Sequence, residues 1–267
     1  MKNIVITGST KGIGLGLAGE FLKKECSVAI SARGKDALEK AVKSLGAEFG
    51  EDKVFGKTCD VSDINQVKEL WDGAMKKFGK IDIWLNNAGM SNTNVFLWEL
   101  DADEINNVVD TNLKGLMYGC KIAIEGMIKQ GHGQIFNFEG LGSDDMMYGG
   151  LIVYGATKRA VRYFTEGLII ETSELPIQVC TISPGMVITD LLIKDLKNMP
   201  QDKRDEILPI FNTLADTVET VTPFLVEKVL ETNESGSRID WMTPEDAQER
   251  FNDEKFYSRN MFSDYGL

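Results

Sequence analysis

The sequence predicts a single α/β domain, doubly wound, with a mostly parallel sheet and helices on both faces. Two observations carry this prediction. Short β-rich runs alternate with longer segments of helical periodicity, a pattern typical of right-handed βαβ crossovers. The 267 residues are 43% hydrophobic and 26% charged, which is the composition of a soluble globular protein. Because neither a linker nor a repeat divides the chain, we expect residues 1–267 to form one domain.

The first half of the chain supplies four of the predicted strands. They are the β-rich runs at residues 4–6, 28–30, 54–58 and 81–85. Apolar residues at helical spacing predict helices between these strands, at residues 14–24, at residues 37–45 and after Asp63. Asp63 precedes the last of these helices and is a typical N-cap residue.

The second half continues the alternation to a last short strand. Strands are predicted at residues 134–138, 177–182 and 237–241, and helices at residues 112–129 and 153–173. Residues 191–233 are the least regular stretch, and they follow a predicted strand at the edge of the sheet where ligands dock. We interpret them as helical segments that cap a substrate pocket. Their apolar side chains, with Met146, Met147 and Tyr148, either line a pocket for a bulky ring or pack a core.

Charge and residue usage exclude several classes of function. The formal net charge is −12, and such a chain repels phosphate backbones, so we expect no nucleic-acid partner. No apolar run is long enough to span a membrane, and from the short apolar run at the first residues we expect no signal peptide. The four cysteines lack a CxxC pair, and we expect a reduced, cytoplasmic protein. His132 is the only histidine, which argues against a histidine-based zinc site or a Ser-His-Asp triad, and we expect no metal.

Four motifs follow predicted strands or begin helices. The first is the glycine-rich turn at residues 7–14, TGSTKGIG, after the first strand. Such a turn lets the backbone approach a pyrophosphate at the start of the next helix. The second is the loop at residues 86–89, NNAG, which we expect beside the first at the ligand crevice. The fourth is the turn at residues 183–189, SPGMVIT.

The third motif is the pair Tyr154 and Lys158. Residues four apart lie on one helix face. A lysine cation beside a phenol favours the phenolate, so we expect Lys158 to lower the pKa of Tyr154 from about 10. A phenol with a lowered pKa is a usable proton donor and acceptor near neutral pH.

Together the four motifs, in this order, resemble the short-chain dehydrogenase/reductase superfamily over residues 3–189. The resemblance implies a Rossmann-type domain that transfers hydride between NAD(P)(H) and an alcohol or ketone, and a homodimer or homotetramer. It implies catalytic roles for Asn112, Tyr154 and Lys158. The implied cofactor-binding residues are Gly8, Ser9, Thr10, Lys11, Gly12, Ile13, Gly14, Asp60, Val61, Asn87, Ala88, Gly89, Tyr154, Lys158, Pro184, Gly185, Val187 and Thr189.

One departure from the family pattern concerns a catalytic serine. The family places Ser-Ser after the fifth strand, whereas this chain has Glu139 and Gly140. Ser143 is the nearest downstream hydroxyl, and an acidic-Gly pair followed by a serine resembles the chlorophyll b reductase-like branch. We expect Ser143 to replace the missing serine as a catalytic residue that orients the carbonyl. The alternative is that Ser143 only caps a loop.

The end of the second strand predicts the cofactor. NAD-preferring enzymes carry a carboxylate there for the ribose 2′-hydroxyl, but this chain has Ala32, followed by Arg33. With Lys11 in the glycine turn, Arg33 would suit a 2′-phosphate, and we expect NADP(H) as the cofactor. The alternative is that Arg33 is a solvated loop residue.

These observations favour an NADP(H)-dependent oxidoreductase acting on a small-molecule alcohol or carbonyl compound. A steroid, a bile acid, a tetrapyrrole or a long acyl ketone would each suit the apolar stretch. The alternative is a nucleotide-sensing protein of the same fold with weak catalysis, supported only by the missing serine. A plain interaction module would explain none of the motif order.

Overall fold

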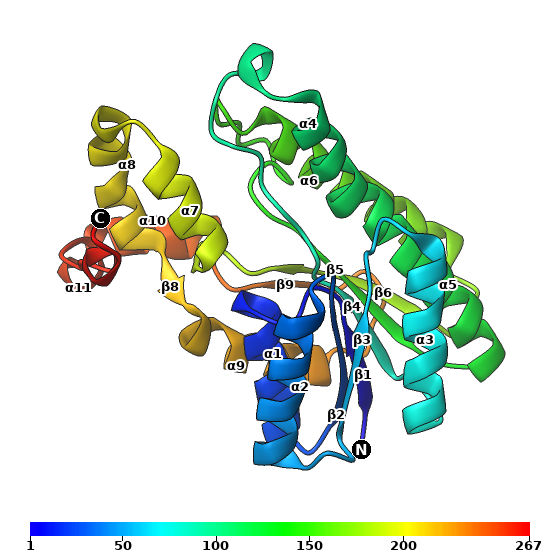
Figure 1. Ribbon diagram of the computed structural model, residues 1–267. Helices are drawn as coiled ribbons and strands as arrows, with labels where there is room; N and C mark the ends of the chain where they lie inside the picture. Colours follow the sequence, from blue (N-terminus) through cyan, green and yellow to red (C-terminus); the bar gives the residue numbers. More distant parts are fainter.

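A seven-stranded parallel sheet forms the centre of the computed structural model, which describes residues 1–267 (Figure 1). The strand order is β3-β2-β1-β4-β5-β6-β9, and every neighbouring pair is parallel. The strands are β1 (Asn3–Ile6), β2 (Ser27–Ala32), β3 (Val54–Thr58), β4 (Ile83–Asn86), β5 (Gln134–Phe138), β6 (Gln178–Ser183) and β9 (Arg238–Asp240). The predicted doubly wound fold is confirmed, with its change of winding direction between β1 and β4.

Helices cover both faces of the sheet. One face carries α1 (Gly12–Lys23), α2 (Lys35–Phe49) and α9 (Val218–Glu231), and the other carries α3 (Ile64–Phe78), α5 (Gly115–Gln130) and α6 (Ile152–Glu171). Side chains alternate between the faces of a strand, so Ile4 and Ile6 of β1 join the first core and Val5 joins the second. Because both faces are buried, the central strands β1, β2 and β4 are mostly apolar.

The helix before β5 begins earlier than residue 112. It starts as α4 (Ala102–Val109), passes through a π-helical turn (Asp110–Lys114) and continues as α5. A π-turn breaks the 3.6-residue period, so apolar spacing indicated only its second part. By contrast, the Asp63 carboxylate accepts a hydrogen bond from the Asn65 backbone N–H at 2.9 Å, which confirms the predicted N-cap.

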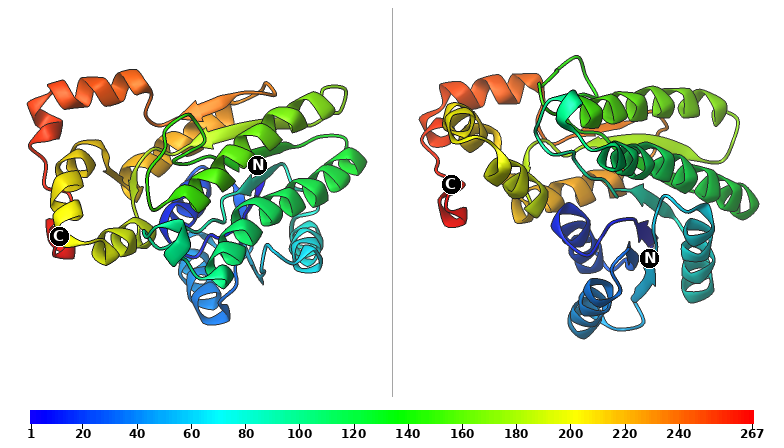
Figure 2. Two further views of the ribbon diagram at one scale, coloured as in Figure 1. Left: turned by 90° about the horizontal axis from the view of Figure 1, so that it is seen from above. Right: turned by 45° about the horizontal axis from the view of Figure 1, so that its top comes forward.

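A cap lies beyond the carboxyl ends of the strands (Figure 2). It contains α7 (Asp190–Asn198) and α8 (Gln201–Leu214), with a small core in which Ile193, Leu196 and Phe262 are buried. The predicted cap of residues 191–233 corresponds only in part, because α9 packs on α1 in the main core instead. Instead of α9, residues 244–267 complete the cap. The sequence did not indicate this. Ile193 and Leu196 are core residues rather than pocket-lining ones, whereas Met146 and Met147 are exposed.

The cap rests on a short second sheet. Its strands β7 (Val187–Ile188) and β8 (Asp216–Thr217) are parallel. The remaining helices are α10 (Pro244–Asn252), α11 (Glu254–Tyr257) and two single turns at Leu97–Glu99 and Ser263–Tyr265. No helix is both long and apolar enough to cross a bilayer.

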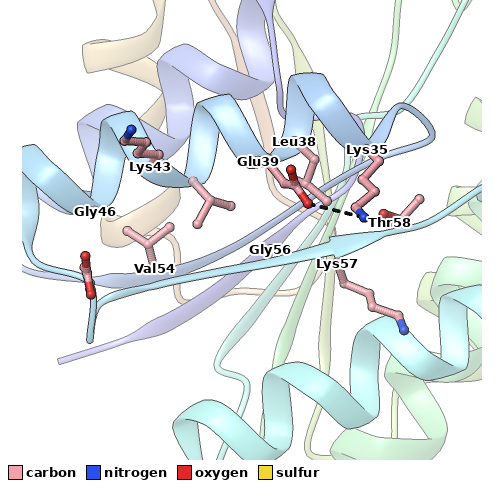
Figure 3. A pocket seen from close by; sticks show the side chains of 11 residues that line it. Lys35, Leu38, Glu39, Lys43, Gly46, Val54, Gly56, Lys57 and Thr58 are labelled. Atoms are coloured by element: carbon pink, nitrogen blue, oxygen red, sulfur yellow. Dashed lines mark ion pairs between the residues drawn. The ribbon is translucent and has the colours of Figure 1, made fainter.

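A groove of about 600 Å³ runs along the edge of the sheet between α2 and β3 (Figure 3). It is lined by residues such as Leu38, Val54 and Gly56, and Lys35 pairs with Glu39 at its rim. The strands β2, β1 and β4 separate this groove from β5. This groove is therefore separate from the region of α6 that carries Tyr154 and Lys158.

Candidate active site

The glycine-rich turn after β1 is packed so closely that side chains would not fit. Gly8 has a φ of +64°, and a Cβ there would lie 2.8 Å from the Cα of Ala88. A Cβ on Gly14 would lie 2.6 Å from the Asn87 Nδ2. Both positions need glycine, the first for its backbone angle as well.

The loop at residues 86–89 is hydrogen-bonded to that turn. The Nδ2 group of Asn87 donates to the carbonyls of Thr7 and Gly8, at 2.9 and 3.0 Å. The Thr7 hydroxyl accepts from the backbone N–H groups of Asn87 and Ala88, at 3.1 and 3.0 Å. The two loops therefore form one rigid unit at the point where the sheet changes winding direction, which is where ligands bind in such folds.

This unit has the features of a dinucleotide-binding site. No side chain caps the N-terminus of α1 at Lys11, so its backbone N–H groups and positive dipole are available to a pyrophosphate. The turn at residues 183–189 lies across it, because a Cβ on Gly12 would be 3.3 Å from the Thr189 methyl. The Lys11 Nζ lies 3.6 Å from an Asp190 carboxylate oxygen, and both side chains are exposed. Arg33 is exposed and makes no ion pair.

Asp60 and Val61 lie in the turn that follows β3. The Asp60 carboxylate accepts hydrogen bonds from the backbone N–H and the hydroxyl of Ser62, at 2.9 and 2.7 Å. Val61 is buried against Gly115 at the start of α5. The Asp60 side chain is thus held in a fixed position by its own turn.

Tyr154 and Lys158 lie one turn apart on α6, as predicted. The Lys158 Nζ donates to the Phe138 carbonyl at 2.9 Å and lies 5.8 Å from the centroid of the Tyr154 ring. Burial lowers the pKa of Lys158 to about 8, against the opposing charge of Glu139. Burial, helped by the charge of Asp195, raises the pKa of Tyr154 to about 12.

The raised pKa of Tyr154 differs from the sequence-based expectation. The cost of burying a phenolate exceeds the attraction of an ammonium group that is bonded to a backbone carbonyl instead of to the phenol oxygen. The phenol is therefore protonated at neutral pH. In that form it is a proton donor, which is the role that reduction of a carbonyl requires.

Asn112 is buried in the π-helical turn and is fully hydrogen-bonded. Its Oδ1 accepts from the Met90 N–H at 2.8 Å, and its Nδ2 donates to the Met90 carbonyl at 2.8 Å and to the Thr157 hydroxyl at 3.1 Å. A Cβ on Gly89 would lie 3.5 Å from the Asn112 Oδ1 and 3.9 Å from the Lys158 Nζ. The structure therefore brings Asn112, Lys158 and the loop at residues 86–89 together.

The place of the absent family serine is occupied by Tyr154. A Cβ on Gly140 would collide with the Tyr154 hydroxyl. Ser143 is buried close by, and its hydroxyl accepts from the Gly140 N–H at 3.1 Å and donates to the Lys158 carbonyl at 3.3 Å. Both contacts are to the backbones that carry active-site side chains.

Three residues of this region were missed by sequence reasoning. Asn92 is buried, and its Oδ1 accepts from the Tyr154 N–H at 3.0 Å while its Nδ2 donates to the Gly150 carbonyl at 2.8 Å. It thus fixes the start of α6. Arg238 of β9 pairs with Glu139. Asp195 of α7 is half-buried and bonded to Ser91, and burial raises its pKa to about 6. No local motif marks any of the three, since each acts through a partner distant in the sequence.

Several known proteins that are similar to this chain are named as dehydrogenases or reductases. The family model described as "short chain dehydrogenase" matches residues 2–200. The chain is 42% identical over 241 residues to chlorophyll(ide) b reductase NOL of Arabidopsis thaliana, a match covering 88% of this chain and 67% of that protein. It is 33% identical over 261 residues to the probable chlorophyll(ide) b reductase NYC1 of the same plant. That match covers 91% of this chain and 51% of that relative, so the chain spans about half of the relative's length.

Solved structures with the same fold include complexes with nicotinamide cofactors. ElxO with NADP bound is 30% identical, with a TM-score of 0.75 over 90% of this chain and 96% of that one. The L-sorbose reductase of Gluconobacter frateurii, in complex with NADPH and L-sorbose, is 25% identical, with a TM-score of 0.76 over 90% and 94%.

The match over residues 2–200 covers the glycine turn, the loop at residues 86–89, Asn112, the Tyr154 and Lys158 pair and the turn at residues 183–189. The same residues converge at the carboxyl ends of β1, β4 and β5. Sequence and geometry therefore agree on one kind of protein. The chain belongs to the short-chain dehydrogenase family of oxidoreductases and is a relative of the chlorophyll(ide) b reductases.

Proposed function

We propose that the protein is an NADP(H)-dependent carbonyl reductase that interconverts a ketone or aldehyde and the corresponding alcohol on a bulky apolar substrate. The observation that carries the proposal is the convergence of a protonated Tyr154, a buried Lys158 and Asn112 beside a loop pair shaped for a dinucleotide. A scaffold that only bound nucleotides would gain nothing from burying an ammonium group and a phenol at the crevice.

Each side chain has a distinct task in this proposal. A bound nicotinamide dinucleotide supplies the hydride that goes to the carbonyl carbon. Tyr154 gives its hydroxyl proton to the carbonyl oxygen, so that an alcohol forms. Lys158 provides a positive charge that assists this proton transfer and holds the nicotinamide ribose. Asn112 is a positioning residue: its side-chain amide, fully bonded to Met90 and Thr157, holds the loop after β4 against α6 beside Lys158.

A tetrapyrrole is the substrate class that we propose. Two of the relatives named above carry the names chlorophyll(ide) b reductase and probable chlorophyll(ide) b reductase. The test is NADPH oxidation with a panel that contains a formyl-bearing tetrapyrrole, a keto-steroid, a keto bile acid and a long-chain acyl ketone. We expect turnover with the tetrapyrrole. Absence of turnover with every compound, although NADPH binds, would favour the nucleotide-sensing alternative.

Arg33 is expected to select the 2′-phosphate of NADPH. It follows Ala32, where an NAD-binding protein carries an acid, and its guanidinium is exposed and without an ion pair. Arg33→Ala should raise the Kd for NADPH about tenfold or more and leave that for NADH unchanged, because a charge-assisted bidentate contact contributes roughly 1.5–3 kcal/mol. Titration of the intrinsic tryptophan fluorescence with each cofactor measures both constants. Equal affinities of the native protein for NADPH and NADH would contradict the proposal.

Ser143 is expected to support the transition state. A preorganised donor beside the carbonyl oxygen is worth a few kcal/mol. To act as that donor, the Ser143 hydroxyl exchanges its hydrogen bond to the Lys158 carbonyl for one to the substrate oxygen. Ser143→Ala should lower turnover tenfold or more with unchanged affinity for NADPH. Steady-state kinetics measure the turnover. An unaltered rate would assign the second donor to a backbone N–H and leave Ser143 as a loop cap.

A further inference from the structure

Glu139 is a buried acid at the end of β5, directly between two backbone groups of the active site. Its side chain is only 2% exposed. On one side, the Phe138 carbonyl accepts the hydrogen bond from the Lys158 Nζ. On the other side, Gly140 makes room for the Tyr154 hydroxyl. A carboxylate at this place would repel negative charge on a substrate oxygen if it faced the cleft.

The carboxylate is bound by an arginine of β9, the strand on the far side of β6. The Nε and Nη2 of Arg238, in β9, both donate to the Glu139 Oε2, at 3.1 and 2.9 Å. Asp240 binds the same guanidinium at 3.1 Å. The Glu139 backbone N–H donates to the Ile182 carbonyl of β6 at 2.8 Å. The fixed, two-point contact with Arg238 prevents Glu139 from reaching a substrate.

The other charged groups that sense Glu139 lie on α6. Burial lowers the pKa of Lys158, and the negative charge of Glu139 opposes that shift. The hydrogen bond to Glu166 raises the pKa of Arg162, and the charge of Glu139 adds to that increase. Tyr154, also on α6, has its pKa raised by burial and by Asp195. Asp144, in the loop that follows Gly140, acts on Arg162 as well. Of these groups, only Lys158 is both buried and able to lose its proton near neutral pH, because burial brings its pKa to about 8.

We propose that Glu139 is a positioning residue that keeps Lys158 in its cationic form, acting through its charge and not through contact with substrate. A buried ammonium group loses its hydration, and a nearby carboxylate offsets part of that cost. The acid at the first position of the family's Ser-Ser pair therefore serves the neighbouring lysine. The kinetic consequence of this inference rests on the proposed function, whereas the charge state of Lys158 does not.

The direct test is an NMR titration of the Lys158 ε-methylene carbon, assigned by its loss in Lys158→Met. We expect Glu139→Gln to move the titration midpoint of Lys158 to lower pH. Arg238→Gln should move it to higher pH, because the carboxylate then acts on Lys158 without its counter-cation. Asp240→Asn is the matched control, since it removes a carboxylate from the same arginine, and it should leave the midpoint unchanged. An unmoved midpoint in Glu139→Gln, or in Arg238→Gln if the first variant does not fold, would overturn the proposal.

Kinetics provide the second test. If the loss of Glu139 displaces the Lys158 titration, the ratio of kcat/KM in Glu139→Gln to that of the native protein should fall about tenfold as the pH rises from about 6 to about 9. Glu139→Asp, which keeps the charge, should restore most of the loss at high pH. A ratio that is the same at every pH would mean a purely structural effect and overturn the proposal. Absence of carbonyl reduction by the native protein would refute the proposed function alone, because the NMR titration needs no turnover.

Discussion

Tyr154→Phe is expected to lower the turnover number by roughly 10²- to 10⁴-fold, the usual effect of losing a general acid. The substitution removes only the hydroxyl, so the ring still packs beside Gly140 and the affinity for NADPH should be unchanged. Burial holds the pKa of Tyr154 at about 12, which keeps the phenol protonated over the whole range of an ordinary assay. Carbonyl reduction should therefore lack a tyrosine-dependent loss of rate below pH 9.

The measurement is single-turnover NADPH oxidation with a carbonyl compound that the native protein reduces, together with a fluorescence titration of NADPH. Tyr163→Phe is the matched control, because Tyr163 lies on the same helix and is 81% exposed. The opposite direction gives an independent check. Alcohol oxidation needs the phenolate, so its rate should rise with pH up to the limit of stability. Near-normal turnover in Tyr154→Phe would refute the assignment.

Asp216→Ala is expected to destabilise the protein by roughly 3–5 kcal/mol, the usual cost of breaking a buried ion pair from one side. Asp216 is almost completely buried, and its Oδ2 accepts from the Trp241 Nε1 and the Arg250 Nη1, both at 2.7 Å. Its Oδ1 accepts from the Arg259 Nη1 at 3.0 Å. Its loss leaves two largely buried guanidinium groups without their carboxylate.

The same residue connects the cap to the cofactor side of the site. Asp216 lies in β8, which pairs with β7 in the turn at residues 183–189, so we also expect a raised KM for the carbonyl compound. Urea unfolding and steady-state kinetics measure the two effects. Asp205→Ala, on the exposed face of α8, is the control and should change stability by less than about 0.5 kcal/mol. Equal unfolding midpoints for the native protein and Asp216→Ala would contradict this account.

The parts that could be predicted from sequence are those that depend on neighbouring residues. Strands buried on both faces are mostly apolar, as in residues 4–6 of β1, so they were visible as runs. Tyr154 and Lys158 share a helix face because four residues make about one turn. The glycines at positions 8 and 14 reflect backbone contacts that allow no Cβ.

The parts that could not be predicted depend on which distant segments meet. The partner of Glu139 is 99 residues away in β9, and only the strand order β5-β6-β9 brings that arginine within reach of Glu139, across β6. Asp195 acquires its raised pKa from burial at the cleft, not from its neighbours in the sequence. The C-terminal residues join the cap because Asp216 binds Arg250 and Arg259.

The sequence by itself therefore determined the fold, the dinucleotide-binding turn and the Tyr154 and Lys158 pair, because periodicity and local backbone geometry are encoded within a few residues. Only the tertiary structure decided the charge balance of the site. Burial and charges from other strands and helices set the protonation of Tyr154 and the pKa of Lys158. They also set the orientation of the Glu139 carboxylate. Those contributions depend on distances in space, for which spacing along the chain contains no information.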